Sequence, residues 1–141
     1  MKVVWIAGPY RAATAQEIEA NIGRAAQRAQ QAADEGHFPI TPHLLTRGLH
    51  APEALWLSGC LAVAQRADEV WLVDGWADSH GTLEEVRAAW HAKNTVRLPD
   101  GRRLVGIEAR NRAAGSAVLV VERPTTGIAK TTRETIRGRA L

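Results

Sequence analysis

The chain has 141 residues, of which 45% are hydrophobic and 23% are charged. This length suits one domain with its own core, and the composition is that of a globular protein rather than a disordered or membrane-spanning one. The longest apolar runs, such as residues 117–121, are far shorter than the roughly 20 residues that cross a bilayer. The lone cysteine, Cys60, excludes an intrachain disulfide. Because the first residues also lack the pattern of a secretory signal, we expect a cytoplasmic protein.

Charge is divided unevenly along the chain. Residues 1–95 have a net charge of −3, whereas residues 96–141 have a net charge of +6. A basic segment of this kind can contact nucleic acid or other anions, but it can equally be a solvated surface or pair with a partner subunit. Nucleic-acid binding therefore stays open as a property of the C-terminal third alone.

Strands and helices are predicted to alternate in the first half of the chain. The apolar, β-branched run 3–7 is typical of a buried strand. Apolar and small residues then recur with a helical period over 13–35, and Gly36 closes that helix. Prolines limit the next segment to a short strand at 38–41 followed by a loop, and a further proline begins a helix over 52–67.

The second half opens with the clearest strand pattern, 69–74. A helix follows over 81–94, and Ser79 or Thr82 can cap its free amides. Residues 98–104 contain a Pro-Asp-Gly turn signal that joins two strand-like arms.

The last strand is predicted at 117–122, in a buried position. Residues 123–141 are polar and basic without a clear period, so we expect a tail or a helix docked on a partner. The domain organisation predicted is therefore one domain over 1–122 and a basic C-terminal tail over 123–141.

This alternation predicts an α/β fold, a flavodoxin-like or Rossmann-like three-layer sandwich with a parallel five-stranded sheet. Ligands of such sheets bind at the carboxyl ends of the strands. Segments 8–11, 42–45 and 74–82 each follow a predicted strand, so we expect them along one edge. That edge is the predicted site.

Four motifs, 6-IAGPYR-11, 39-PITPH-43, 67-ADEVWLVDGW-76 and 79-SHGTLEE-85, together resemble the nucleoside 2-deoxyribosyltransferase-like superfamily. The likeness is greatest to the 2′-deoxynucleoside 5′-phosphate N-hydrolases and to small phage and bacterial members. It extends over residues 2–95 in the expected order and spacing. Nothing is carried over onto residues 96–141.

The resemblance implies cleavage of an N-glycosidic bond by a glutamate that meets positive charge at C1′ of the sugar. The family's nucleophile follows the glycine of its motif by four residues, which is Glu85 here. Its neighbour Glu84 is rotated by about 100° on a helix and suits only the positive helix end. Six residues before the nucleophile, hydrolases carry a serine that binds a 5′-phosphate and transferases an aspartate. Here that residue is Ser79, although a shift of one residue would offer Asp78 instead.

The first loop and its neighbours supply the rest of the expected site. Gly8 permits close backbone approach, Tyr10 resembles a site-lining residue, and Arg11 resembles the arginine that meets the phosphate. His43 either lies near the nucleotide or is structural. The expected catalytic residues are Glu85, Tyr10 and Asp74, and the expected substrate-binding residues are Gly8, Pro9, Arg11, His43, Trp76, Asp78, Ser79, Gly81 and Thr82.

One residue departs from the family pattern. Many members have an aspartate where this chain has Cys60, and a thiol supplies no permanent carboxylate charge. The role of that acid then passes to Asp74 or Asp78, or the leaving base needs less proton assistance, or activity is reduced. The histidines and Cys60 show no zinc-site spacing, and no dinucleotide or P-loop motif is present, so we expect neither metal nor cofactor.

Three functions remain open from sequence. The first is hydrolysis of 2′-deoxynucleoside 5′-monophosphates to free base and sugar phosphate. The second is transfer of deoxyribose between bases, and the third is a non-catalytic nucleotide-binding or nucleic-acid-binding module. In this superfamily a neighbouring subunit commonly completes the pocket, so we expect a homodimer or higher homo-oligomer with a shared site, and no membrane partner.

Overall fold

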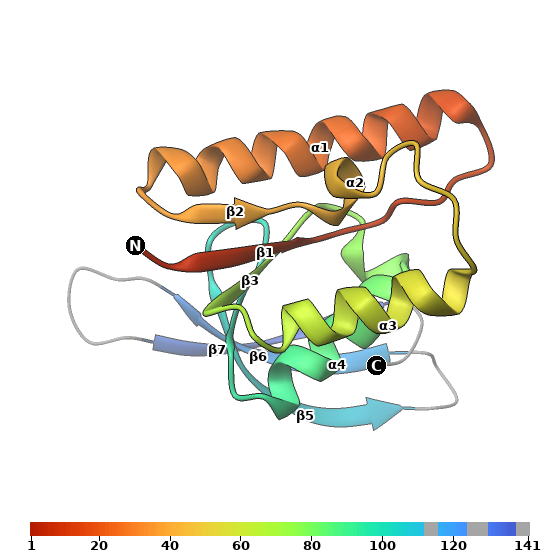
Figure 1. Cartoon of the computed structure of the whole chain (residues 1–141). Coiled ribbons are helices and arrows are strands. Elements are labelled where there is room, and N and C mark those ends of the chain that lie inside the picture. Colours follow the sequence, from red (N-terminus) through yellow and green to blue (C-terminus); the bar gives the residue numbers. More distant parts are fainter. Residues whose placement is uncertain (112–115, 124–129, 138–141) are drawn as a thin grey trace.

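The structure is a computed structural model that describes residues 1–111, 116–123 and 130–137, with side chains described for residues 1–106, 121 and 122. Figure 1 shows the arrangement of its elements. In chain order they are β1 (Val3–Ala7), α1 (Ala15–Asp34), β2 (Phe38–Ile40), α2 (Pro42–Leu45), α3 (Glu53–Ala64), β3 (Glu69–Leu72), the 3-10 turn η1 (Trp76–Asp78), α4 (His80–His91), β4 (Thr95–Arg97), β5 (Arg103–Asn111), β6 (Ser116–Arg123) and β7 (Lys130–Arg137).

The described strands form one mixed sheet in the order β2-β1-β3-β4-β5-β6-β7. Strands β1 to β4 pair in parallel, whereas β5, β6 and β7 each pair antiparallel with the strand before them. The α/β class is therefore confirmed, but the prediction of a parallel five-stranded sheet is wrong. The predicted turn after β4 explains why: Leu98 N–H donates to Arg102 O at 2.8 Å, and Gly101 adopts φ +86. Such a tight turn can join only antiparallel strands.

Helices cover both faces of the parallel strands. Strand β1 alternates, so that Val4 and Ile6 pack with Ala25 and Ala29 of α1, whereas Trp5 packs in the other core. That second core also takes in buried residues of α3 and α4, among them Ala64, Leu83 and Val86. Figure 1 shows α1 on one side of β1 and both α3 and α4 on the other. The period-2 alternation of β1 thus decides which side chains can meet α4.

The helix ends follow from local sequence. Thr14 begins α1 with a capping box, in which its hydroxyl accepts from Glu17 N–H and the Glu17 carboxylate accepts from Thr14 N–H. Ser79 caps α4, as expected. Residues 42–45 form the short helix α2, with Pro42 in its first turn, where a loop was predicted.

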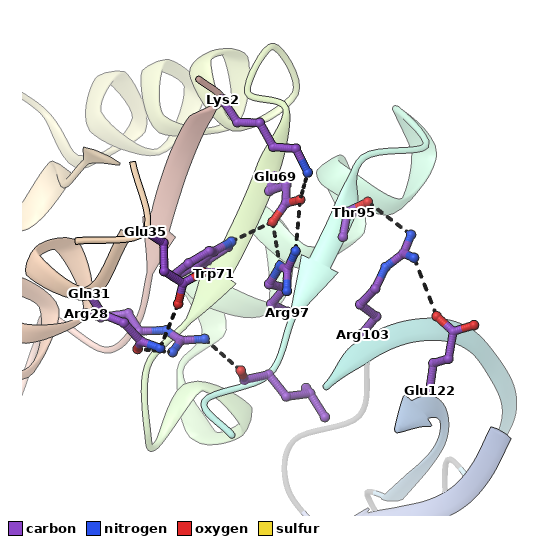
Figure 2. Close-up of polar contacts among 11 residues, drawn as sticks. Lys2, Arg28, Gln31, Glu35, Glu69, Trp71, Thr95, Arg97, Arg103 and Glu122 are labelled. Carbon is purple, nitrogen blue, oxygen red and sulfur yellow. Dashed lines mark hydrogen bonds and ion pairs between the residues drawn. The ribbon is translucent and has the colours of Figure 1, made fainter. Parts of the chain in front are cut away.

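A buried polar cluster ties the starts of β1 and β3 to β4 (Figure 2). The Glu69 carboxylate accepts from Lys2 Nζ at 2.5 Å, from Arg97 Nε at 2.6 Å and from the Trp71 indole at 2.7 Å. Burial alone would raise the pKa of Glu69, but these hydrogen bonds outweigh it and lower the pKa to about 2. Arg28 of α1 lies over the other side of the cluster, 4.8 Å from the Trp71 ring centre. The cluster fixes the strand edge opposite the candidate site.

The C-terminal part differs from the predicted tail. Residues 130–137 form β7, which pairs antiparallel with β6 along its whole length, from Ser116 opposite Arg137 to Arg123 opposite Lys130. The predicted last strand is confirmed as β6, but the boundary at 122 does not end the sheet. Among the described residues, no helix has the length and apolar character needed to cross a membrane.

Candidate functional site at the carboxyl edge of the parallel strands

The loops after β1 and β3 touch each other at the carboxyl edge. Val73 N–H donates to Ala7 O at 2.9 Å, and a Cβ placed on Gly8 would lie 2.7 Å from the Cβ of Val73. Gly75 adopts φ +83, and a Cβ placed on it would lie 3.5 Å from Pro9 Cγ. A side chain at position 8 would collide with a branched β-carbon that cannot rotate away, so Gly8 permits the close approach of Val73. Its expected contact with substrate stays a prediction.

His43 holds the loop that follows β1. Its Nε2 lies 3.2 Å from Gly8 O and 3.1 Å from Pro9 O, and the side chain is only 4% exposed. Burial lowers the pKa of His43, and the two backbone contacts oppose this shift, so the ring is neutral with its proton on Nε2. The half-exposed Tyr10 ring packs edge-on against His43 with centres 5.8 Å apart. His43 therefore positions the loop that carries Tyr10.

Ser79 and Thr82 organise the start of α4. The Ser79 Oγ accepts from Thr82 N–H at 3.4 Å and from the Thr82 hydroxyl at 2.9 Å. With both acceptor positions used, the Ser79 hydroxyl keeps its own proton for donation to a ligand. Gly81 has open space around it. The first turn of α4 can therefore present hydroxyl and amide donors to an anion.

Glu85 lies one and a half turns into α4, on the stripe that faces the sheet with Thr82, Val86 and Ala89. The residue is 7% exposed. Burial raises the pKa of Glu85 to about 8, and the nearby Trp5 side chain opposes this shift. The Trp5 indole N–H nevertheless makes no hydrogen bond of normal geometry with any described residue. A buried, weakly compensated carboxyl of this kind is typical of functional sites.

Cys60 of α3 lies across from Glu85. Burial raises the pKa of the Cys60 thiol to about 11, and the negative charge of ionised Glu85 contributes to the shift. The thiol therefore stays neutral at physiological pH and within electrostatic range of the carboxyl. Cys60 thus lies near Glu85 but brings no second charge to it.

The remaining expected residues are more dispersed. Arg11 is exposed and pairs with Glu53 at the start of α3, Nη1 to Oε1 2.9 Å. Asp74 and Asp78 are both exposed, and Asp78 lies in the 3-10 turn. Trp76 is buried in the core with Leu83 and Val86, so no face of its ring is free to stack on a base. Among residues 1–106, 121 and 122, no group of histidine, cysteine and acidic side chains could hold a metal ion.

Two neighbours of the site escaped the sequence reasoning. Trp5 lies in the predicted buried strand 3–7, and its period-2 position places it on the face of Ala7, but no local signal shows that α4 brings a carboxyl near it. Asn21 of α1 is buried and donates to Tyr10 O at 3.1 Å. Its signal was a polar residue on the apolar stripe of a helix, next to Ile22 and Ala25.

In a comparison with known proteins, no curated protein matches the chain. A protein-family profile described as a domain of unknown function, DUF7768, matches residues 2–98, which take in the parallel strands β1 to β4, helices α1 to α4 and the whole candidate site. The chain belongs to the DUF7768 family.

Proposed function

We propose that this protein hydrolyses the N-glycosidic bond of 2′-deoxynucleoside 5′-monophosphates, releasing free base and sugar phosphate. The observation that carries the proposal is Glu85, a buried carboxyl with a pKa of about 8 on the second turn of a helix that begins at the strand-end loops. The four motifs that resemble the nucleoside 2-deoxyribosyltransferase-like superfamily support the same residue. So does the parallel order β2-β1-β3-β4 with helices on both faces, which suits a flavodoxin-like site at this edge.

The reaction proceeds in two displacements at C1′. A carboxylate oxygen of Glu85 bonds to C1′ while the C1′–N bond breaks and its electron pair leaves with the base, which takes up a proton. Water then bonds to C1′ through its oxygen and loses one proton, and the electron pair of the ester bond returns to Glu85. The proton comes from water, and Asp74, exposed at the end of β3, is the candidate residue to position that water, while Tyr10 lines the sugar.

Glu85 must be ionised to attack, which sets the pH dependence. In the free protein its pKa of about 8 leaves most molecules protonated at pH 7. Neutral Cys60 adds no charge that would raise this pKa further. Positive charge forming on the sugar favours the ionised carboxylate, and we expect kcat/KM to rise about tenfold per pH unit below pH 8 and to level off above it.

Ser79 favours a 5′-monophosphate over a free nucleoside as the substrate. Its hydroxyl accepts twice from Thr82 and keeps a proton to donate, and the amides at the start of α4 favour an anion. A 5′-phosphate satisfies these donors, whereas an aspartate here would repel it. Arg11 would contribute to phosphate binding on exchanging its exposed partner Glu53 for the ligand.

The test is incubation with matched deoxynucleosides and their 5′-monophosphates, with free base measured by chromatography. We expect base release from the monophosphates and its loss in Glu85→Gln. Glu84→Gln is the matched control, because Glu84 lies one residue earlier on α4 and pairs with Arg87 instead. Ser79→Asp should lower kcat/KM for monophosphates far more than for nucleosides. Base release that persists in Glu85→Gln would contradict the mechanism.

The same assay separates the alternatives. Exposed Asp78, one residue before Ser79, favours a transferase if it rather than Ser79 meets the sugar 5′-hydroxyl. Adding a second free base would then yield a new deoxynucleoside. Cys60 in place of an acid favours a non-catalytic binding module, which would bind nucleotide or nucleic acid with no base released. Loss of base exchange in Asp78→Ala would support a role of that carboxylate in transfer.

A further inference from the structure

The apolar core on the α1 side of the sheet ends at β3. The buried cluster on this side joins α1 only to residues of β1 and β3. Trp71 of this cluster pairs with Arg97 of β4, and Arg97 pairs with Arg103 of β5, so all three residues lie on the same side. Figure 1 shows α1 beside β1 and β2, at the end of the sheet away from β5, β6 and β7. We call the α1 side of strands β4 to β7 the open face.

Two arginines begin the open face. The side chain of Arg103 is 52% exposed, and its guanidinium contacts Glu122 at 3.5 Å and Thr95 at 3.4 Å, both long for such contacts. Arg97 is 28% exposed and binds the buried Glu69 carboxylate. Figure 2 shows the two arginines on the neighbouring strands β4 and β5. An exposed ion pair contributes little to stability, so Arg103 can exchange its partners for another anion.

The pairing register continues the basic character of the open face onto β7. Thr131 pairs with Glu122, which itself pairs with Arg103, so Thr131 lies on the open face. Alternate residues of a strand share one face, and in β7 those on the open face are all hydroxyl or guanidinium residues: Thr131, Arg133, Thr135 and Arg137. The acid of β7, Glu134, belongs to the opposite set and pairs with Leu119. The strand therefore separates its acid from these two arginines.

The chemistry of the open face suits the backbone of a nucleic-acid duplex. Guanidinium and hydroxyl groups both donate hydrogen bonds to phosphate oxygens. Residues 91–141 contain no phenylalanine, tryptophan or tyrosine, so the open face has no such ring on which an unpaired base could stack. Three strand spacings separate β4 from β7, roughly 14 Å, which is comparable with the width of the DNA major groove, about 12 Å. Arginines at the two sides of the face can therefore reach phosphates of both DNA strands.

We propose that the open face of β4 to β7 binds double-stranded DNA through its phosphate backbone. The inference goes beyond the proposed hydrolysis and does not depend on it, because α4, which carries Glu85, packs on the other side of the sheet. Backbone contacts carry little sequence information but depend strongly on salt. For about three phosphate contacts, log Kobs falls with log salt at a slope of about −2.7, so the affinity should decrease roughly 40-fold between about 50 and 200 mM salt.

Fluorescence anisotropy of a short labelled DNA duplex, titrated with the full chain, tests the proposal. The double variant Arg103→Gln, Arg133→Gln removes two charges from the open face. We expect its Kd at low salt to increase roughly tenfold or more, and the salt slope to become shallower by about 1.8. The matched control is Arg110→Gln, Lys130→Gln, which removes two charges from the same two strands on the opposite face, that of Val121. The control should keep the salt slope of the parent.

Further variants separate charge, folding and catalysis. Arg103→Lys with Arg133→Lys keeps both charges and should retain binding. Circular dichroism confirms that each variant is folded, and Arg133→Gln alone, with an expected slope change of about 0.9, replaces the double variant if that one is destabilised. Glu85→Gln should bind the duplex like the parent, so this proposal and the proposed hydrolysis can fail separately. Absent or salt-independent binding, tighter binding of one DNA strand alone, or an equal loss in both double variants would overturn the proposal.

Discussion

Replacing Glu85 with glutamine should make the protein more stable at alkaline pH. Burial raises the pKa of Glu85 from its ordinary value of 4.5 to about 8 in the folded protein. The folded state therefore holds this proton more tightly than the unfolded state does. The stability that the protonated group contributes is fully present below pH 4.5 and is lost as the pH rises through 8. At about 1.4 kcal/mol per pKa unit, the whole loss is roughly 5 kcal/mol, as an upper bound.

Glutamine has nearly the same shape and carries no ionisable proton, so it removes this dependence. The assay is urea unfolding of parent and Glu85→Gln at a series of pH values between 4 and 9, with stability from linear extrapolation. The difference in free energy of unfolding should grow by several kcal/mol across the series in favour of Glu85→Gln. Glu84→Gln, the same change one residue earlier, should show no such gain. A difference that stays flat from pH 5 to 9 would refute the buried-carboxyl argument.

Three further predictions concern the scaffold. Gly8→Ala should lower the free energy of unfolding by about 1–3 kcal/mol in urea titration, because its Cβ would lie 2.7 Å from Val73 Cβ; an unchanged midpoint would contradict the packing described. The pKa of Glu69 is lowered from 4.5 to about 2, so ionised Glu69 stabilises the fold above pH 4.5, and this stability is lost as the pH falls through 2. Acid unfolding followed by circular dichroism should show a loss of up to roughly 3 kcal/mol in the parent. Glu69→Gln should not show this loss. His43→Leu should lower the free energy of unfolding by about 1–2 kcal/mol, because the Gly8 and Pro9 carbonyls lose their donor. The variant should also be cleaved faster by protease at Tyr10. Equal cleavage of parent and variant would argue against a positioning role for His43.

The parallel half of the fold was predictable because its signals are local. The strand at 3–7, the helices around 13–35 and 52–67, and the cap at Ser79 all follow from residues within a turn or two of the element. The sequence also predicted close backbone approach at Gly8, which directly follows the first strand. The turn signal at 98–104 implies that the strand after β4 runs antiparallel, as it does. No local signal shows that β6 and β7 continue the same sheet.

The site shows the same division between local and distant information. The resemblance implied a nucleophile four residues after the motif glycine, at Glu85 rather than Glu84, and the structure places Glu85 inward and Glu84 beside Arg87. The roles of Arg11 and Trp76 depended on distant partners. Arg11 meets Glu53, and the Trp76 ring fills the core, contacts that no pattern within a few residues reports. The predicted tail failed for a similar reason, since only pairing with β6 makes residues 130–137 a strand.

The sheet changes direction at the same place where the family match stops. Residues 2–98 contain the parallel strands and end at the turn into β5. After that turn, each described strand pairs antiparallel with the strand before it, as in successive hairpins. Leu104 of β5 and Val121 of β6 are nevertheless buried in the same core cluster as Trp5 and Val86, so a related chain that exchanged this ribbon would have to refill those core positions.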